Sequence, residues 1–134
     1  MWEKKEPKYG DHIRVSRGFY SHHGIYASKN SVFHFAPPGQ TDVLDPSAAR
    51  IIETSLEEFL KGGILEVRTY SEEEQGRKRN PGEIIECARS HLGEGGYDLI
   101  SNNCEHFANL CVFGSKESNQ VNAVLSFLFG GKPV

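Results

Sequence analysis

Three short segments near the start of the chain alternate between apolar and polar residues, and this pattern constrains the fold more than any other feature. The segments are HIRVSR (12–17), HHGIYAS (22–28) and SVFHFA (31–36). Such alternation is typical of β-strands that lay one face on a core. Only Lys29 and Asn30 separate the last two segments, and asparagine suits a left-handed turn position, so we expect a tight β-hairpin there.

The middle of the chain carries a helix signal, a strand signal and a charged stretch. TSLEEFLKGG (54–63) predicts a short helix that begins at Thr54 or Ser55, where a hydroxyl can cap the first turn. ILEVRTY (64–70) alternates again and predicts a strand. SEEEQGRKRN (71–80) is dominated by charge, and we expect it to be a solvated loop.

The next segment, NPGEIIECARSHLG (80–93), has the start and stop signals of a helix. Asn80 is a suitable cap, Pro81 suits the first helical position and Gly93 suits the end. Helical spacing predicts a buried stripe formed by Ile84, Ile85, Ala88 and Leu92.

Two more helices are expected towards the C-terminus. CEHFANLCVF (104–113) is followed by Gly114, and a last helix is predicted over 118–129. Strands thus come first and helices later, which predicts an α+β fold with an antiparallel sheet packed against helices. A chain of 134 residues is too short for two independent cores, so we expect a single domain over 1–134.

Composition narrows the partners and the location. A net charge of -3 and a pI near 6.1 argue against a nucleic-acid binder that depends on neutralising phosphates. The start of the chain lacks the apolar core of a signal peptide. The late apolar run AVLSFLF (123–129) is far shorter than the roughly 20 residues that span a bilayer. We therefore expect no transmembrane segment and a cytoplasmic location.

The three cysteines do not form a disulfide framework. Cys104 and Cys111 lie seven positions apart on one predicted helix, about 10 Å along its axis, which is too far to bridge. A reducing compartment is the simpler interpretation. Cys111 and Cys87 are interpreted as packing or structural residues.

Cys104 differs because it opens its helix. A cysteine reacts as a thiolate, and the unpaired backbone N–H groups of a helix start favour that anion and can bind an oxyanion. Ser101, Asn102 or Asn103 is the expected cap. A small core residue is the competing interpretation of this position.

A nucleophilic cysteine needs a base, and the predicted hairpin offers three histidines. His22 and His23 are adjacent on one strand and His34 lies on the next, so the hairpin can bring one of the pair beside His34. Neighbouring residues of a strand point to opposite faces, so His22 and His23 cannot both face the thiol. Periodicity alone leaves open which of them does.

The remaining histidines and a metal site are weaker candidates. His106 is about 200° round the helix from Cys104, so we expect it to brace the helix. His91 suits a helix C-terminus and His12 is uninformative. Zinc on His22, His23, His34 and Cys104 is an alternative interpretation, but no Cys-x-x-Cys or His-x-x-x-His spacing is present, so we expect no metal and no cofactor.

Four stretches taken together resemble one known family. YGDHIRV, FYSHHGIYAS, SVFHFAPPG and NNCEHFANLCVFG are similar to the lecithin retinol acyltransferase domain family, a circularly permuted branch of the NlpC/P60 papain-like superfamily. The resemblance covers about residues 9–114, and the block Asn-Cys-Glu-His-Phe (103–107) is its most specific part.

The resemblance implies a Cys-His-His catalytic site. The family's nucleophile falls on Cys104, its first histidine on His22 and its second on His34, which favours His22 over His23. It implies acyl transfer through a cysteine thioester, with His22 moving the proton and His34 orienting His22. Tyr20, close to His22, and Asn103 are candidate oxyanion-binding or positioning residues.

These implications predict a thiol-dependent acyltransferase or acyl hydrolase. The expected substrate class is phospholipid or other acyl esters, and the alternatives are an NlpC/P60-like amidase or cysteine peptidase and a non-catalytic regulatory binding module of the same fold. Vertebrate family members generally carry a C-terminal transmembrane anchor. Here the tail NAVLSFLFGGKPV is expected either to contact a membrane peripherally or to pack on the domain.

Overall fold

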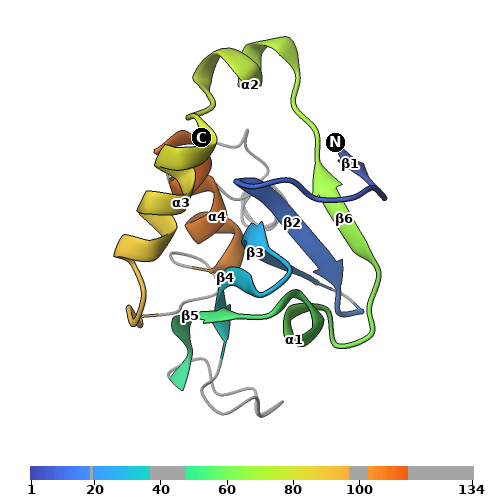
Figure 1. Ribbon diagram of the computed structural model, residues 1–134, viewed down its shortest axis with the longest axis vertical. Helices are drawn as coiled ribbons and strands as arrows, with labels where there is room; N and C mark the ends of the chain where they lie inside the picture. The colour runs from blue at the N-terminus through green and yellow to red at the C-terminus, as the bar shows by residue number, and fades with distance from the viewer. Residues whose placement is uncertain (19, 37–47, 97–102, 115–134) are drawn as a thin grey trace, which may run out of the picture.

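The computed structural model describes residues 1–18, 20–36, 48–96 and 103–114, and these residues form an α+β fold, as predicted. Within them, one antiparallel sheet of six strands has the order β1-β6-β2-β3-β4-β5 (Figure 1). The strands are β1 (Trp2–Glu3), β2 (Asp11–Ser16), β3 (Ser21–Ser28), β4 (Ser31–Ala36), β5 (Arg50–Thr54) and β6 (Leu65–Arg68).

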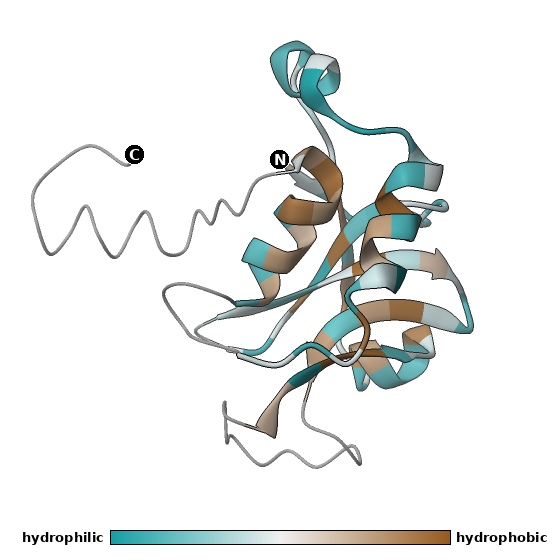
Figure 2. Ribbon diagram, turned by 90° about the vertical axis from the view of Figure 1, so that its left-hand side faces the viewer, coloured by the Kyte–Doolittle hydropathy of each residue, from teal (hydrophilic) through white to brown (hydrophobic). Residues whose placement is uncertain are grey.

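Helices cover both faces of this sheet. The described helices are α1 (Leu56–Leu60), α2 (Glu72–Arg77), α3 (Pro81–Ser90) and α4 (Cys104–Phe113). The pair α3 and α4 lies side by side on one face, whereas α1 lies on the other (Figure 1). Figure 2 shows α4 hydrophobic along most of its length, whereas α3 alternates between hydrophobic and hydrophilic residues. The helix that begins with Cys104 is thus the more deeply packed of the two.

Strand alternation divides the core into two parts. On the helix-pair side, Ile25 and Phe33 pack with α3 and α4 around Phe107. On the opposite side, Val32 packs with Phe59 of α1 and with the smaller aliphatic residues of β2 and β6. Because the sheet is buried on both faces, a single strand such as β3 can direct adjacent histidines into two different environments.

β3 and β4 pair only over the second half of β3, next to the turn of the hairpin. Its Cα partners are Ile25↔Phe33, Tyr26↔Val32 and Ser28↔Ser31, with a register shift between Tyr26 and Ser28. The first half of β3 remains paired on its other edge, where His22 lies opposite Val15 of β2. Among the described residues, one edge of β3 is therefore unpaired with another strand at the level of His22.

Three local predictions are corrected by the structure. The charged stretch 71–80 contains a helix, α2, because Ser71 and Glu74 form a reciprocal capping box. Asn30 lies in the predicted turn but not in the left-handed region, since Lys61 is the one non-glycine residue with positive φ among those described. Leu92 is 39% exposed because α3 ends at Ser90, before Leu92 can join the buried stripe.

Other predictions concern the extent of the sheet and the chain's tail. The sequence prediction contained neither β1 nor β5, the two outer strands of the sheet. The predicted last helix, 118–129, lies outside the described residues. In the described ranges, the longest helices have ten residues and none is long and apolar enough to span a bilayer.

Candidate functional site

The start of α4 is fixed by a capping box around Cys104. Asn103 is the N-cap, and its side-chain oxygen accepts from the backbone N–H of His106 at 2.9 Å. In return, Nδ1 of His106 accepts from the backbone N–H of Asn103 at 3.0 Å. The predicted bracing role of His106 is thus confirmed, and Asn103 is identified among the three candidate caps. Both interactions hold Cys104 at the first helical position.

The sulfur of Cys104 contacts the backbone of β3 on both sides of His22. Its thiol donates to the carbonyl of Ser21 at 3.7 Å. The backbone N–H of His23 is also directed at the sulfur. These two groups belong to the peptide units immediately before and after the Cα of His22. The structure therefore places the thiol at the His22 position of the strand.

This contact uses the unpaired edge of β3. Tyr20 and Tyr26 point their carbonyls towards β2, where they accept from Arg17 and Gly10, so even-numbered residues of β3 bond to β2. The odd-numbered Ser21 and His23 consequently point their polar backbone groups towards the β4 side. Because β4 has no paired residue at that level, Cys104 occupies the place of a strand partner.

His22 and His34 are joined directly: the hairpin pattern predicted one of the adjacent histidines beside His34, and it is His22, the one that the family resemblance favoured. Nε2 of His22 lies 2.9 Å from Nδ1 of His34. Phe59 of α1 stacks on His22 with ring centroids 5.1 Å apart and meets His34 edge-on at 5.0 Å. Gly24 makes room for this ring, because a Cβ there would lie 2.7 Å from an edge carbon of Phe59. The two imidazoles are thus held by a hydrogen bond and by one aromatic side chain.

Both imidazoles are neutral in the resting site. Burial lowers the pKa of His34 to about 4, with further lowering by Lys61 and Arg17, and a hydrogen bond to the Phe35 backbone acts in the opposite direction. Burial, followed by the charge of His34 when protonated, holds the pKa of His22 well below its usual value. A neutral imidazole has one lone pair to accept a proton, which is what a general base requires.

The environment of Cys104 differs from the sequence expectation. Burial raises the pKa of its thiol to about 11, and the nearby Glu105 carboxylate raises it further. The N–H groups of His23, Glu105 and Cys104 itself lower this pKa but do not overcome burial. The helix start therefore supplies the expected anion-stabilising donors, but the resting group is a thiol because Cys104 is only 3% exposed.

A second histidine pair, which the sequence did not reveal, lies on the opposite face of β3. Nε2 of the fully buried His12 lies 2.8 Å from Nδ1 of His23, and Trp2 packs edge-on against both rings. Within the described residues, Nδ1 of His12 has no hydrogen-bond partner. The Glu105 carboxylate raises the pKa of His23, but burial dominates and lowers it to about 4. Alternation at His22 and His23 was the signal that these two rings must diverge.

The other candidate residues take simpler places. Tyr20 is 39% exposed at the end of the turn into β3, and its backbone carbonyl accepts from Arg17 at 2.8 Å. Cys111 is fully buried, as predicted, and its thiol is hydrogen-bonded to that of Cys87. Across the described ranges, no group of three histidine, cysteine or acidic residues is placed to hold a metal ion.

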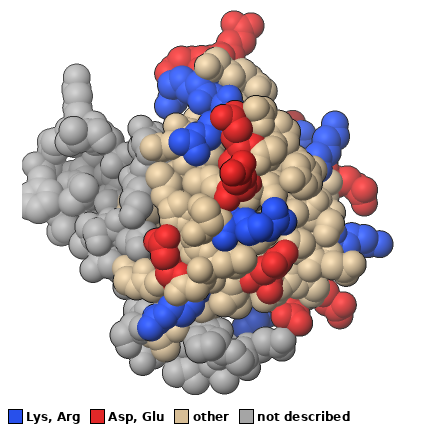
Figure 3. All heavy atoms as spheres, turned by 60° about the vertical axis from the view of Figure 1, so that its left-hand side comes forward, with Lys and Arg blue, Asp and Glu red and all other residues tan. Residues whose placement is uncertain are grey.

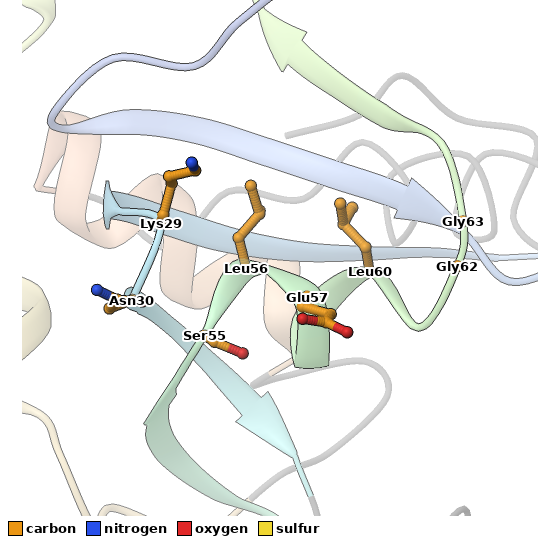
Figure 4. Close-up of a pocket in the computed structure, with 8 residues that line it drawn as sticks. All are labelled: Lys29, Asn30, Ser55, Leu56, Glu57, Leu60, Gly62 and Gly63. Carbon is orange, nitrogen blue, oxygen red and sulfur yellow. The ribbon is translucent and has the colours of Figure 1, made fainter.

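A groove of about 640 Å³ opens beside α1. Figure 4 shows Leu56 and Leu60 extending from α1 towards β2. Lys29 and Asn30 lie at one end of the groove, and Gly62 and Gly63 lie at the opposite end. His22, His34 and Cys104 do not line this groove, so we assign the groove no role in the site. On the described part of the face shown in Figure 3, basic and acidic side chains intermingle and form no broad basic surface.

Comparison with known proteins decides the family. The family described as Lecithin retinol acyltransferase matches residues 5–117, most of the chain. The chain belongs to the lecithin retinol acyltransferase family.

Relatives of this family member include enzymes of two kinds. Phospholipase A and acyltransferase 3 of Homo sapiens is 33% identical over 130 residues, covering 90% of this chain and 79% of the relative. Phospholipase A and acyltransferase 4 of Homo sapiens is 30% identical over 126 residues, covering 87% and 76%. Lecithin retinol acyltransferase of Rattus norvegicus is 30% identical over 134 residues, covering 83% of this chain but 56% of the relative. The chain is thus homologous to acyltransferases and phospholipases.

Proposed function

We propose that this family member is a thiol-dependent acyltransferase or acyl hydrolase that acts on phospholipid or other acyl esters through a thioester on Cys104. One observation carries the proposal: the sulfur lies against both peptide groups that flank His22, and the ring of His22 is bonded to His34. A nucleophile, a base and an orienting group are the parts that covalent acyl transfer needs.

The first half of the proposed reaction forms the acyl-enzyme. Nε2 of His22 is engaged with His34, so Nδ1 is the nitrogen that takes the proton from the thiol of Cys104. The sulfur attacks the ester carbonyl carbon to give a tetrahedral oxyanion. On collapse the carbon–oxygen ester bond breaks, His22 returns the proton to the leaving alkoxide oxygen, and a thioester remains.

The second half releases the acyl group. Water, or the hydroxyl or amine of an acceptor, gives its proton to His22 and attacks the thioester carbonyl. The tetrahedral intermediate then expels the sulfur, which regains a proton from His22. Water as acceptor gives a free fatty acid, whereas a hydroxyl or amine gives an ester or an amide.

The electrostatics support a base that works during the attack. At neutral pH, a thiol with a pKa near 11 stays protonated, and the buried imidazoles stay neutral. No stable ion pair therefore forms in advance, and the proton moves as the sulfur attacks. The three N–H groups around the sulfur then stabilise the negative charge that develops on the sulfur as its proton leaves.

The setting of this activity is part of the same proposal. The circularly permuted NlpC/P60 arrangement explains why the histidine strands precede the cysteine helix in this chain. Phospholipase A and acyltransferase 3 is named for action on lipids, which supports a phospholipid substrate and peripheral contact with a lipid surface. A cytoplasmic location fits a thiol that must remain reduced.

Turnover of phosphatidylcholine in mixed micelles tests the proposal. Released fatty acid and acyl transfer to an added amine are measured for the wild type and for Cys104→Ser, His22→Asn and His34→Asn. We expect Cys104→Ser and His22→Asn to lose at least about a hundredfold in kcat, as expected when a nucleophile or general base is removed.

Cys111→Ser is the matched control, because it removes a buried thiol from the same helix. It should retain turnover. Equal activity of Cys104→Ser and Cys111→Ser would contradict the proposal, as would the absence of turnover on any acyl ester. Cleavage of peptide amides with no action on esters would instead assign the site to an amidase.

A further inference from the structure

The hydrogen-bond chain of the site extends one residue beyond His34. Oγ1 of Thr54, the last residue of β5, lies 2.8 Å from Nε2 of His34. The same oxygen lies 3.1 Å from the carbonyl of Ser55, to which its hydroxyl donates. Thr54 thus connects the two imidazoles to a fixed backbone acceptor.

This connection sets the direction of each hydrogen bond. A threonine hydroxyl has one proton, and a carbonyl oxygen can only accept, so the Thr54 proton is committed to Ser55. Oγ1 of Thr54 must then accept from Nε2–H of His34. A neutral imidazole has one N–H, which leaves Nδ1 of His34 as an acceptor.

The same reasoning passes to His22. Since Nδ1 of His34 accepts, Nε2–H of His22 donates across the 2.9 Å contact. Nδ1 of His22 then carries a lone pair and no proton. With the opposite direction along the chain, Nδ1 of His22 would carry the proton and could not take another from Cys104.

We propose that Thr54 is a positioning residue that fixes the tautomers of His34 and His22 and so keeps Nδ1 of His22 unprotonated. This inference rests on the proposed function, in which His22 takes the thiol proton. Thr54 acts through the two histidines and does not contact the sulfur.

The burial of the histidines strengthens the requirement for such an anchor. His34 is only 4% exposed, so an unpaired N–H on its ring would have no bulk water to turn to. Because His34 stays neutral at physiological pH, its single proton must be placed on one nitrogen or the other. The Phe35 backbone is a second acceptor beside the ring, and we infer that the shorter-range anchor at Thr54, 2.8 Å from Nε2, decides which nitrogen holds it.

Nuclear magnetic resonance of the imidazole nitrogens reads this directly. Two-bond ¹H–¹⁵N spectra at neutral pH, assigned with His22→Asn and His34→Asn, should show both rings protonated on Nε2 in the wild type. Thr54→Val keeps the shape and β-branching of the side chain but removes the hydroxyl. It should move part of the His34 population to the form protonated on Nδ1. Thr54→Ser should restore the wild-type spectrum.

Turnover provides the second readout. We expect Thr54→Val to lower kcat by about three- to tenfold, the effect of one ordinary hydrogen bond, with little change in KM. Thr54→Ser should regain most of the activity. Thr69→Val, the same substitution at a threonine just after β6, is the matched control and should change neither the tautomers nor kcat.

The outcomes separate this inference from the proposed function. Protonation of His34 on Nδ1 in the wild type, or unchanged tautomers in a folded Thr54→Val variant, would overturn the role of Thr54. If no acyl donor is turned over but the tautomers are as described, the proposed function fails while the assigned direction of the hydrogen bonds stands.

Discussion

Gly24 illustrates how one residue supports the pair of imidazoles without touching a substrate. It lies two positions after His22 on the same face of β3, and the ring of Phe59 fills the space that a side chain would take. Phe59 contacts both His22 and His34. The absence of a Cβ at position 24 is therefore a condition for the packing that holds both rings.

A methyl group at this position should displace Phe59 and disturb the imidazoles. A Cβ would lie 2.7 Å from Phe59 and 3.1 Å from the carbonyl of Phe33, so relief requires movement of the ring. We expect Gly24→Ala to lower the free energy of unfolding by about 1–3 kcal/mol, typical of overpacking, and to reduce kcat. Urea unfolding and a turnover assay measure the two effects.

Gly76→Ala is the control for this substitution, because a Cβ in α2 would meet nothing within 4 Å. It should be neutral or slightly stabilising. The double variant Gly24→Ala with Phe59→Leu should recover part of the activity by restoring space. Wild-type stability and kcat in Gly24→Ala would show that the contact with Phe59 is unimportant.

For single residues, the sequence predicted the place of a residue in its strand or helix better than the contacts of its side chain. A two-residue turn fixes the strands of the hairpin, so one of His22 and His23 could be paired with His34, and the family resemblance favoured His22. His12 looked uninformative because nothing in a strand pattern shows that its ring meets His23. Thr54 was one of two candidates for a helix start, and Ser55 is the actual cap. The contact of the Thr54 hydroxyl with His34 could not be predicted, because it depends on the diagonal placement of β4 and β5.

Among the elements, α4 and the hairpin of β3 and β4 act together. The first half of β3 is hydrogen-bonded to β2 on one edge, and on the other edge it contacts Cys104, the first residue of α4. The cap residue Asn103 fixes where that first residue lies. The reach of the sulfur to the strand therefore depends on the cap as well as on the cysteine.

Substitution of the cap tests whether Asn103 acts through the helix. Asn103→Ala should cost about 0.5–2 kcal/mol of stability and lower turnover, because Oδ1 no longer accepts from the N–H of His106. Asn103→Ser retains a capping oxygen and should keep most of both. Thermal unfolding and turnover of the two variants distinguish them.

Asn80 offers a matched control, since it caps α3 with the same reciprocal box. Asn80→Ala should lose comparable stability and keep its kcat. If Asn103→Ser lost as much turnover as Asn103→Ala while remaining as stable as the wild type, the amide itself would be acting on the reacting groups.

The elements found from the sequence are those with strong local signals. The helices after Asn80 and before Gly114 have clear caps, and the structure agrees with both. The helix α2 could have been found from Ser71 and Glu74, but the density of charge around them favoured a loop. The outer strand β1 has only two residues, and RIIET of β5 does not alternate between apolar and polar residues. Both strands gain their structure from pairing with neighbours, which no local pattern contains.

For the whole molecule, the most consequential feature is the number of neutral histidines enclosed on both faces of one sheet. The pKa values of His23 and His34 are lowered to about 4, and burial also lowers that of His12. Arg14 and Arg68 act in the same direction on His12 and His23. Each of these groups must gain a proton more readily when the chain unfolds.

Stability should therefore fall as the solution becomes acidic. Between the unfolded pKa of 6.5 and the folded value of about 4, the unfolded chain binds protons that the folded one does not. The free energy of unfolding should be highest above pH 6.5 and decrease towards pH 4, with His34 alone contributing up to about 3 kcal/mol of this change. Urea midpoints measured from pH 7.5 to 4.5 give the slope.

The double variant His12→Leu with His23→Leu isolates the histidine contribution, because all carboxylates remain. Its urea midpoint should vary less with pH than that of the wild type. Identical pH slopes for the two proteins would mean that this pair already carries its ordinary pKa values in the folded state.

At this largest scale the α+β class followed from the order of strand and helix patterns. The two-sided burial of the sheet did not, because the short helix α1 gave no sign that it would cover the face opposite α3 and α4. The raised pKa of Cys104 likewise reflects the whole core, which outweighs the local effect of its helix start.

The central claim is that the sulfur at position 104 carries the acyl group between donor and acceptor. Mass measurement of the intact protein after rapid acid quenching, with phosphatidylcholine as donor, tests this most directly. We expect a mass increase of one fatty acyl group, mapped to the peptide that contains Cys104, removed by neutral hydroxylamine and absent in Cys104→Ser. Steady turnover with no acyl group on Cys104, or with the acyl group on Cys87 or Cys111, would contradict the account.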